Sequence, residues 1–120
     1  MVTDPDASEH DVGPLFAALA DPTRRRVVGL LGSRPRRAGE LAEATGTSGP
    51  TMSRHLRVLL AAGLVDDERG RDDARVRLFR LRPQSVVALR AWVDQLQAEW
   101  DHQLASFKDH VERRVEEGNR

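Results

Sequence analysis

The sequence predicts a mostly helical fold with one small β-hairpin, and three observations lead to this prediction. Apolar residues recur every three or four positions in four short segments and in one long segment near the C-terminus. A glycine-centred turn separates the third short segment from the fourth. Two strand-like segments flank a polar tip just before the long segment. Four helices, two strands and a helix are the order of a winged helix-turn-helix.

Composition favours a single small domain that is not an enzyme. Of its 120 residues 39% are hydrophobic, and none is cysteine, which excludes disulfides and thiolate chemistry. Neither a Gly-rich phosphate loop nor a Gly-x-Ser-x-Gly elbow is present, so we expect no catalysis and no cofactor. Since no membrane span or signal peptide is seen, we expect a cytoplasmic protein without a membrane partner.

The charge of the chain is zero overall but is unevenly distributed. Residues 1–21 carry a charge of −5, whereas residues 22–63 carry +6. The two later parts, 64–82 and 83–120, carry +1 and −2. The positive charge therefore lies on the segment with the helix-turn-helix, which is typical of a nucleic-acid-binding surface.

The first two helices are expected on either side of Asp21, after a disordered acidic tail of residues 1–10. Pro14 suits the first turn of the first helix. Asp21 and Pro22 form an N-cap and first-turn pair that begins the second helix, which ends near Gly32. The apolar residues of the first helix are Leu15, Phe16, Ala18, Leu19 and Ala20, and the expected buried face of the second consists of Val27, Val28, Leu30 and Leu31.

The helix-turn-helix itself is expected between residues 39 and 62. Its first helix covers residues 39–45, and Gly46 is the natural left-handed residue of the turn. Ser48 then caps the second helix, where Pro50 is tolerated because a first-turn residue has no N–H partner to lose. Inward-facing positions are Leu41, Ala42 and Ala44, followed by Met52, Leu56, Leu59 and Leu60.

The hairpin and a long helix complete the expected fold. Residues 64–68 and 75–81 are expected strands, with a slip in the alternation near Leu78, and residues 69–74 form the exposed tip. From Gln84 to about Glu117 one helix is expected, about 45 Å long and therefore longer than so small a core can cover. We thus divide the chain into a tail (1–10), a DNA-binding domain (11–83), a C-terminal dimerisation helix of the same domain (84–117) and a tail (118–120).

The excess length of that helix predicts a homodimer, because a Trp/Leu/Phe stripe beyond the globular body needs a partner. The alternative is an internal helix folded back on its own domain. The residues expected at the dimer interface are Leu15, Phe16, Leu19, Leu89, Trp92, Leu96, Trp100, Leu104 and Phe107.

The polar face of the 49–62 helix is the candidate DNA-reading surface. Arg54 and His55 are assigned to base edges, since both can donate to guanine in the major groove. Phosphate contacts are assigned to Ser48, Thr51, Ser53 and Arg57, with Pro50 beside them. An ordinary solvated face is the alternative.

The hairpin tip is a second candidate surface for DNA. Arg69, Arg71 and Arg75 flank Gly70 and are assigned to the adjacent minor groove or phosphates. Internal pairing of these arginines with Asp72 and Asp73 is the alternative.

Four segments carry a resemblance to a known family: Leu19–Arg25, Gly39–Ala42, Ser53–Leu59 and Ala62–Val65. In this order they resemble the ArsR/SmtB family of bacterial transcriptional repressors, over about residues 12–100. The resemblance implies a homodimeric winged helix that represses transcription from a palindromic double-stranded DNA operator near its own promoter. Founding members of the family release DNA on binding metal, and others respond to other signals.

The metal sites of the family do not carry over to this sequence. The positions of its Cys-x-Cys pair are Ala42 and Ala44 here, and Asp101 adjoins His102 instead of forming an Asp-x-His pair. We therefore expect no metal site, and an unknown small-molecule inducer is the possible signal. Two alternatives stay open: a metal sensor that uses His102 and His110, and a winged-helix interaction module that does not bind DNA.

Overall fold

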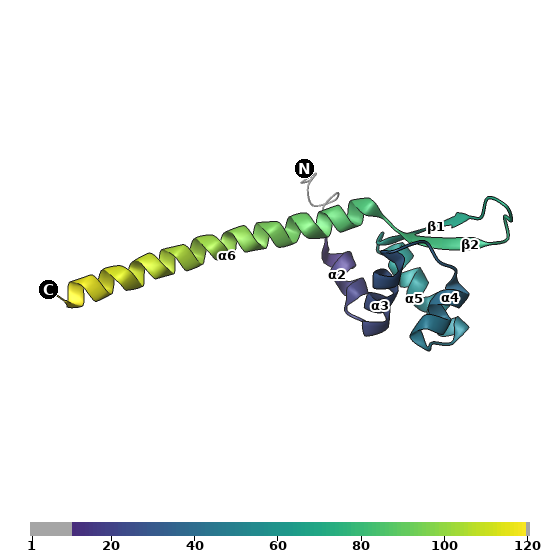
Figure 1. The fold of residues 1–120 in the computed structure, drawn as a ribbon, viewed down its shortest axis with the longest axis horizontal. Coiled ribbons are helices and arrows are strands. Elements are labelled where there is room, and N and C mark those ends of the chain that lie inside the picture. Colours follow the sequence, from purple (N-terminus) through teal and green to yellow (C-terminus); the bar gives the residue numbers. More distant parts are fainter. Residues whose placement is uncertain (1–10, 120) are drawn as a thin grey trace, which may run out of the picture. The chain divides into compact units, whose positions relative to one another are not determined.

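A computed structural model describes residues 11–119 and has the expected winged helix-turn-helix architecture. The tail assigned to residues 1–10, and Arg120 of the tail assigned to 118–120, lie outside the described residues. Figure 1 shows α2 to α5 packed together, with the hairpin of β1 and β2 beside them. The elements are α2 (Gly13–Leu19), α3 (Pro22–Leu31), α4 (Ala38–Thr45), α5 (Gly49–Ala61), β1 (Val65–Arg69), β2 (Arg77–Leu81) and α6 (Pro83–Gly118).

The signals that begin and end the helices act as expected. The Asp21 carboxylate accepts the backbone N–H of Thr23 at 2.8 Å and that of Arg24 at 3.1 Å, which caps α3. Ser48 Oγ accepts the N–H of Thr51 at 3.3 Å and caps α5. Gly46 ends α4 in the left-handed region at φ 66°, where a side chain would be strained. The turn that sets α4 against α5 is therefore specified locally.

The core lies between α2–α5 and the hairpin. Its fully buried side chains include Val27 of α3, Leu41 of α4, Met52 and Leu59 of α5, and Val65 of β1. Around this core lie the half-buried side chains Leu19, Val28, Leu30, Leu60, Leu81, Ala88 and Leu89. These contacts fix one side of α5 against protein and leave its other side exposed.

Ala44 corrects one sequence expectation, because it is exposed. The inward face of the two-turn helix α4 is centred between Leu41 and Ala42 and includes Ala38 and Thr45. Ala44 lies to one side of that face, and its carbonyl accepts a hydrogen bond from Arg26 Nη2 at 3.0 Å.

The hairpin is antiparallel and its second strand is shorter than expected. β2 begins at Arg77 instead of residue 75, and Arg69 opposite it is the last residue of β1. Phe79 is the buried residue of β2, and its backbone pairs with Arg36 on the other edge through N–H···O bonds of 2.8 and 3.0 Å. The alternation places Arg77 on the same face as Phe79. That face turns towards α5.

The chain divides into two units inside α6, one ending at Leu89 and one beginning at Arg90. In the first unit, Ala88 and Leu89 pack against the core. The second unit is the rest of α6, and its described side chains are exposed, except Leu96, which is half-buried. No helix within residues 11–119 is long and apolar enough to cross a membrane.

Candidate nucleic-acid interface

Helix α5 separates an apolar side from a polar side. Met52, Leu56 and Leu59 are at most 2% exposed and fill the core. Ser53, Arg54 and Arg57 are exposed, as are Ser48 and Pro50 at the start of the helix, while Thr51 and His55 are half-buried. The structure therefore brings the predicted α5 residues onto one surface, on which Thr51 and His55 are only partly exposed.

Hydroxyl groups in the first turn of α5 hold Arg54 along the helix. Ser48 Oγ donates to Thr51 Oγ1 at 2.9 Å, and Arg54 Nη2 donates to the same oxygen at 3.2 Å. A guanidinium carries five N–H donors, and this contact uses one of them. The fork of Arg54 is therefore oriented but retains donors for an external acceptor.

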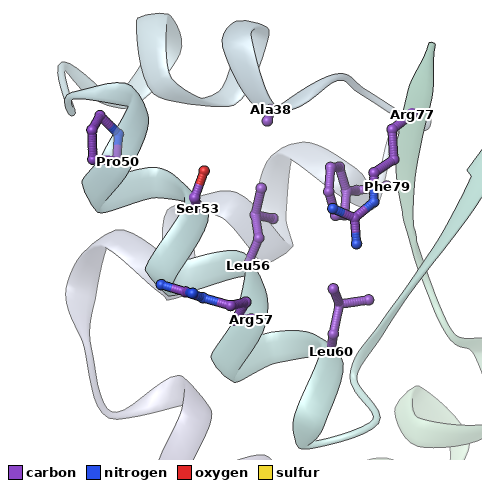
Figure 2. Close-up of a pocket in the computed structure, with 8 residues that line it drawn as sticks. All are labelled: Ala38, Pro50, Ser53, Leu56, Arg57, Leu60, Arg77 and Phe79. Carbon is purple, nitrogen blue, oxygen red and sulfur yellow. The ribbon is translucent and has the colours of Figure 1, made fainter. Parts of the chain in front are cut away.

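A groove of about 360 Å³ lies between α5 and β2, and Ala38 at the start of α4 also lines it. In Figure 2, Ser53 and Arg57 extend from α5 and Arg77 from the facing strand. The charged side chains that line it are both arginines. The complete lining is Ala38, Pro50, Ser53, Leu56, Arg57, Leu60, Arg77 and Phe79.

Arg77 is a candidate site residue that sequence reasoning missed. Its guanidinium lies 4.9 Å from the centre of the Phe79 ring, and its Nε donates to Asp67 Oδ2 at 2.5 Å. These two contacts hold the side chain in place over the groove. The period-two alternation with Phe79 was the available signal, but the identity of the neighbouring helix was not visible from the strand alone.

The three arginines predicted at the tip of the hairpin differ in their contacts. Arg69 and Arg71 are exposed. Arg75 instead forms a bidentate pair with Asp73, with Nε–Oδ1 and Nη2–Oδ2 distances of 3.1 Å. Hydrogen bonds from the Arg75 side chain, and then from its backbone, lower the pKa of Asp73 below its ordinary value. Arg75 thus forms an internal pair with Asp73 while its side chain stays 92% exposed, and its role on DNA stays a prediction.

The arginines at the start of α3 bind backbone carbonyls at the ends of neighbouring helices. Arg24 Nε donates to Ala18 O at 2.6 Å, and Arg25 Nη1 donates to Leu19 O at 2.8 Å. Carbonyls in the last turn of a helix have no partner within that helix, so these cations stabilise the end of α2.

The predicted dimer residues fall into two groups. Leu15 departs from the expectation, because its side chain is 5% exposed and belongs to the core of its own protomer. Phe16 is 39% exposed, whereas Leu19 and Leu89 pack partly against the core. On the second unit, Leu96 is half-buried, and the more exposed members of the stripe are Trp92, Trp100, Leu104 and Phe107.

The metal-sensor alternative has no ligand set in the described chain. Across residues 11–119, no group of three or more His, Cys, Asp or Glu side chains could hold a metal ion. His102 and His110 are both exposed on α6.

Fold and surface together define a class of protein, a winged-helix DNA-binding protein. Comparison with known proteins identifies its family. A family profile described as a helix-turn-helix domain matches residues 19–68. The HTH-type transcriptional regulator Rv2034 of Mycobacterium tuberculosis (strain ATCC 25618 / H37Rv) is 37% identical over 97 residues, covering 81% of this chain and 85% of that protein.

Two further relatives agree with this assignment. The transcriptional repressor SdpR of Bacillus subtilis (strain 168) is 40% identical over 55 residues, which is 46% of this chain and 61% of that protein. A homodimeric winged helix-turn-helix DNA-binding domain from Mycobacterium bovis, described as a possible ArsR-family regulator, is 28% identical. That structure superposes with a TM-score of 0.62, covering 85% of this chain and 93% of the other.

The chain belongs to the ArsR/SmtB family of helix-turn-helix transcriptional regulators. Proteins of this family are DNA-binding regulators and not enzymes.

Proposed function

We propose that this regulator is a homodimeric repressor that reads an inverted-repeat operator with α5 in the major groove. The observation that carries the proposal is the division of α5 into a buried apolar side and an exposed side of hydroxyls and arginines. A helix with these two sides can pack on its domain and lie in a DNA groove at once. Repression follows from occlusion of a promoter by the bound dimer in the cytoplasm.

The contacts are proposed to divide by position. Arg54 and His55 face base edges, and Ser48, Thr51, Ser53 and Arg57 contact phosphates, beside Pro50. The groove between α5 and β2 adds Arg77 to the phosphate contacts, because Arg77 lines this groove from the strand that faces α5. Arg69, Arg71 and Arg75 extend this surface along the hairpin, where Arg75 is oriented by Asp73 as Arg77 is by Asp67.

The dimer is proposed to form through α2 and the stripe of α6. From Val93 onwards the apolar residues of the stripe follow one another at spacings of three, four and four, and Trp92 adjoins this repeat in sequence. This is an 11-residue repeat, which favours a straight or right-handed helix pair. A two-fold axis would place the two α5 helices about one DNA turn apart. The repeat consists of Val93, Leu96, Trp100, Leu104, Phe107, Val111 and Val115.

Release from DNA is proposed to depend on a small-molecule inducer or on protein concentration. A ligand can move the dimer off DNA only if it prefers one conformation. The family's thiolate positions are Ala42 and Ala44 here, and the described residues form no cluster that could supply such a preference through metal.

Arg54→Ala tests the proposal on DNA from the upstream region of the gene, followed by fluorescence anisotropy at several salt concentrations. We expect a loss of about 1–3 kcal/mol on the operator and a smaller loss on random DNA, because base contacts carry the discrimination. The control is Arg113→Ala, which removes an exposed arginine from the second unit and should leave affinity unchanged. If the wild type shows no salt-dependent binding at all, the chain is an interaction module and the proposal is wrong.

A further inference from the structure

One arginine side chain connects the DNA-reading helix to two other helices of the domain. Arg24 belongs to the first turn of α3. Its Nε donates to Ala18 O at 2.6 Å and its Nη2 to Ala17 O at 3.4 Å, both at the end of α2. Its Nη1 lies 3.3 Å from Nδ1 of His55 on α5. The guanidinium thus bridges α2 and α5, although Arg24 and His55 are 31 residues apart in the sequence.

The chemistry of this contact selects one tautomer of the neutral imidazole ring. A guanidinium carries only N–H donors and has no lone pair to accept with. A hydrogen bond between Arg24 and His55 therefore requires Nδ1 to be the acceptor, which leaves the ring proton on Nε2. The two ring nitrogens point in divergent directions, so Nε2–H points away from Arg24.

The Arg24 backbone is held by the N-cap of α3, and its guanidinium is held by the end of α2. The backbone N–H of Arg24 donates to Asp21, the N-cap of its own helix, at 3.1 Å. The carbonyls of Ala17 and Ala18 lie in the last turn of α2, where the negative end of the helix dipole attracts a cation, and the Ala17 carbonyl also accepts the Ala20 N–H at 3.3 Å. Arg24 can consequently present Nη1 to His55 without further ordering of its side chain.

We propose that Arg24 is a positioning residue that makes His55 a neutral Nε2–H donor towards the DNA bases. This inference rests on the proposed function, since it assigns His55 a base edge. A donor of this kind pairs with an acceptor in the major groove, such as guanine N7 or O6, and is repelled by the amino group of cytosine. Arg24 therefore contributes to specificity without contacting DNA itself.

The adjacent residue provides a matched control. Arg25 also donates to carbonyls at the end of α2, Leu19 O at 2.8 Å and Ala20 O at 3.1 Å. Within residues 11–119 it has no hydrogen bond to α5. Arg25→Met thus removes a brace of α2, whereas Arg24→Met removes a similar brace together with the contact to His55.

The first measurement is the tautomer of His55 in the full chain without DNA, by long-range ¹H–¹⁵N correlation of the imidazole ring. We expect the Nε2–H form in the wild type and in Arg25→Met. In Arg24→Met we expect a mixture of the two neutral tautomers. A wild-type ring protonated on Nδ1, or one that does not respond to Arg24→Met, would overturn the proposal whatever the protein does with DNA.

The second measurement is affinity for the operator and for operators with single base changes. Arg24→Met and His55→Ala should each reduce affinity about tenfold, should relax preference at the same base pair, and should not add in the double variant. Arg25→Met should keep that preference. If the losses of affinity are additive, or if the base preference survives Arg24→Met, then Arg24 only stabilises the end of α2 and the proposal is wrong.

Two variants distinguish a failure of this proposal from misfolding and from a failure of the proposed function. Arg24→Lys keeps a cation and donors near His55, so it should restore part of the base preference if Arg24→Met folds poorly. Arg54→Ala reports on DNA reading by α5 independently of Arg24. If Arg54→Ala weakens operator binding while Arg24→Lys and Arg24→Met leave base preference intact, the inference about Arg24 is wrong and the proposed function stands.

Discussion

At the scale of residues, polar side chains of this domain act mainly by completing the ends of helices. Asp21 caps α3, Ser48 caps α5, and Arg24 and Arg25 supply donors to the last carbonyls of α2. The same side chains hold the residues proposed to face DNA, since Ser48 contacts Thr51 and Arg24 contacts His55. Stability and recognition therefore share residues at this surface.

The cap at Asp21 makes a pH-dependent contribution to stability. The backbone N–H of Arg24 is the largest cause that lowers the pKa of Asp21 below its ordinary 3.8. A carboxyl with a lowered folded-state pKa stabilises the fold above its unfolded pKa, and this contribution is lost as pH falls through the folded value. Below pH 3.8 the wild type should therefore lose stability more steeply than Asp21→Asn, because asparagine still caps a helix when neutral.

Urea unfolding at several acidic pH values measures this difference. Asp72→Asn at the exposed hairpin tip is the control and should follow the wild type. The cap assignment would be contradicted if the free energy of unfolding fell equally with decreasing pH in the wild type and in Asp21→Asn.

At the scale of elements, α5 and β2 together make the surface that neither makes alone. The groove between them joins Ser53 and Arg57 of the helix to Arg77 of the strand. Phe79 fixes this arrangement, because its ring is buried and its backbone pairs with Arg36.

Arg77→Ala is expected to weaken binding to operator and random DNA by similar factors, since a phosphate contact carries no sequence information. The slope of log affinity against log salt concentration should fall by about two, because each protomer of the dimer loses one phosphate contact. Arg80→Ala is the control, because Arg80 lies on the opposite face of the same strand and lies 3.9 Å from Glu68. Selective loss on the operator would instead assign Arg77 to a base.

Local signals explain how much of these elements the sequence predicted. Caps, prolines and Gly46 act within a few residues, so the order and most bounds of the helices were readable. Ala44 was assigned wrongly because two turns of α4 are too short to define a face by periodicity. The Arg77 groove and the Arg24–His55 contact join elements distant in sequence, and no local pattern encodes such packing.

At the scale of the whole molecule, the apolar stripe on α6 is the feature that a single protomer leaves exposed. Trp100 is 54% exposed in the described chain, although tryptophan is strongly stabilised by burial. The stripe continues at regular spacing to Val115, which is the pattern of a helix that pairs with a second copy.

Trp100→Ala is expected to weaken the dimer by about 3 kcal/mol, within the range for truncation of a buried aromatic side chain. Sedimentation at micromolar concentration should show a dimer for the wild type and a shift towards monomer for the variant. Val87→Ala, an exposed position of α6 outside the stripe, should leave the dimer intact. A monomeric wild type would contradict the proposed dimer.

The central claim is that a two-fold dimer reads DNA through α5, and a hydroxyl-radical footprint on the upstream region of the gene tests it most directly. The account expects two protected patches related by two-fold symmetry, with centres about 10 base pairs apart or a multiple of that. Arg54→Ala should remove both patches together, because each protomer contributes one copy of α5. A single patch, or no protection at any concentration that binds random DNA, would contradict the account.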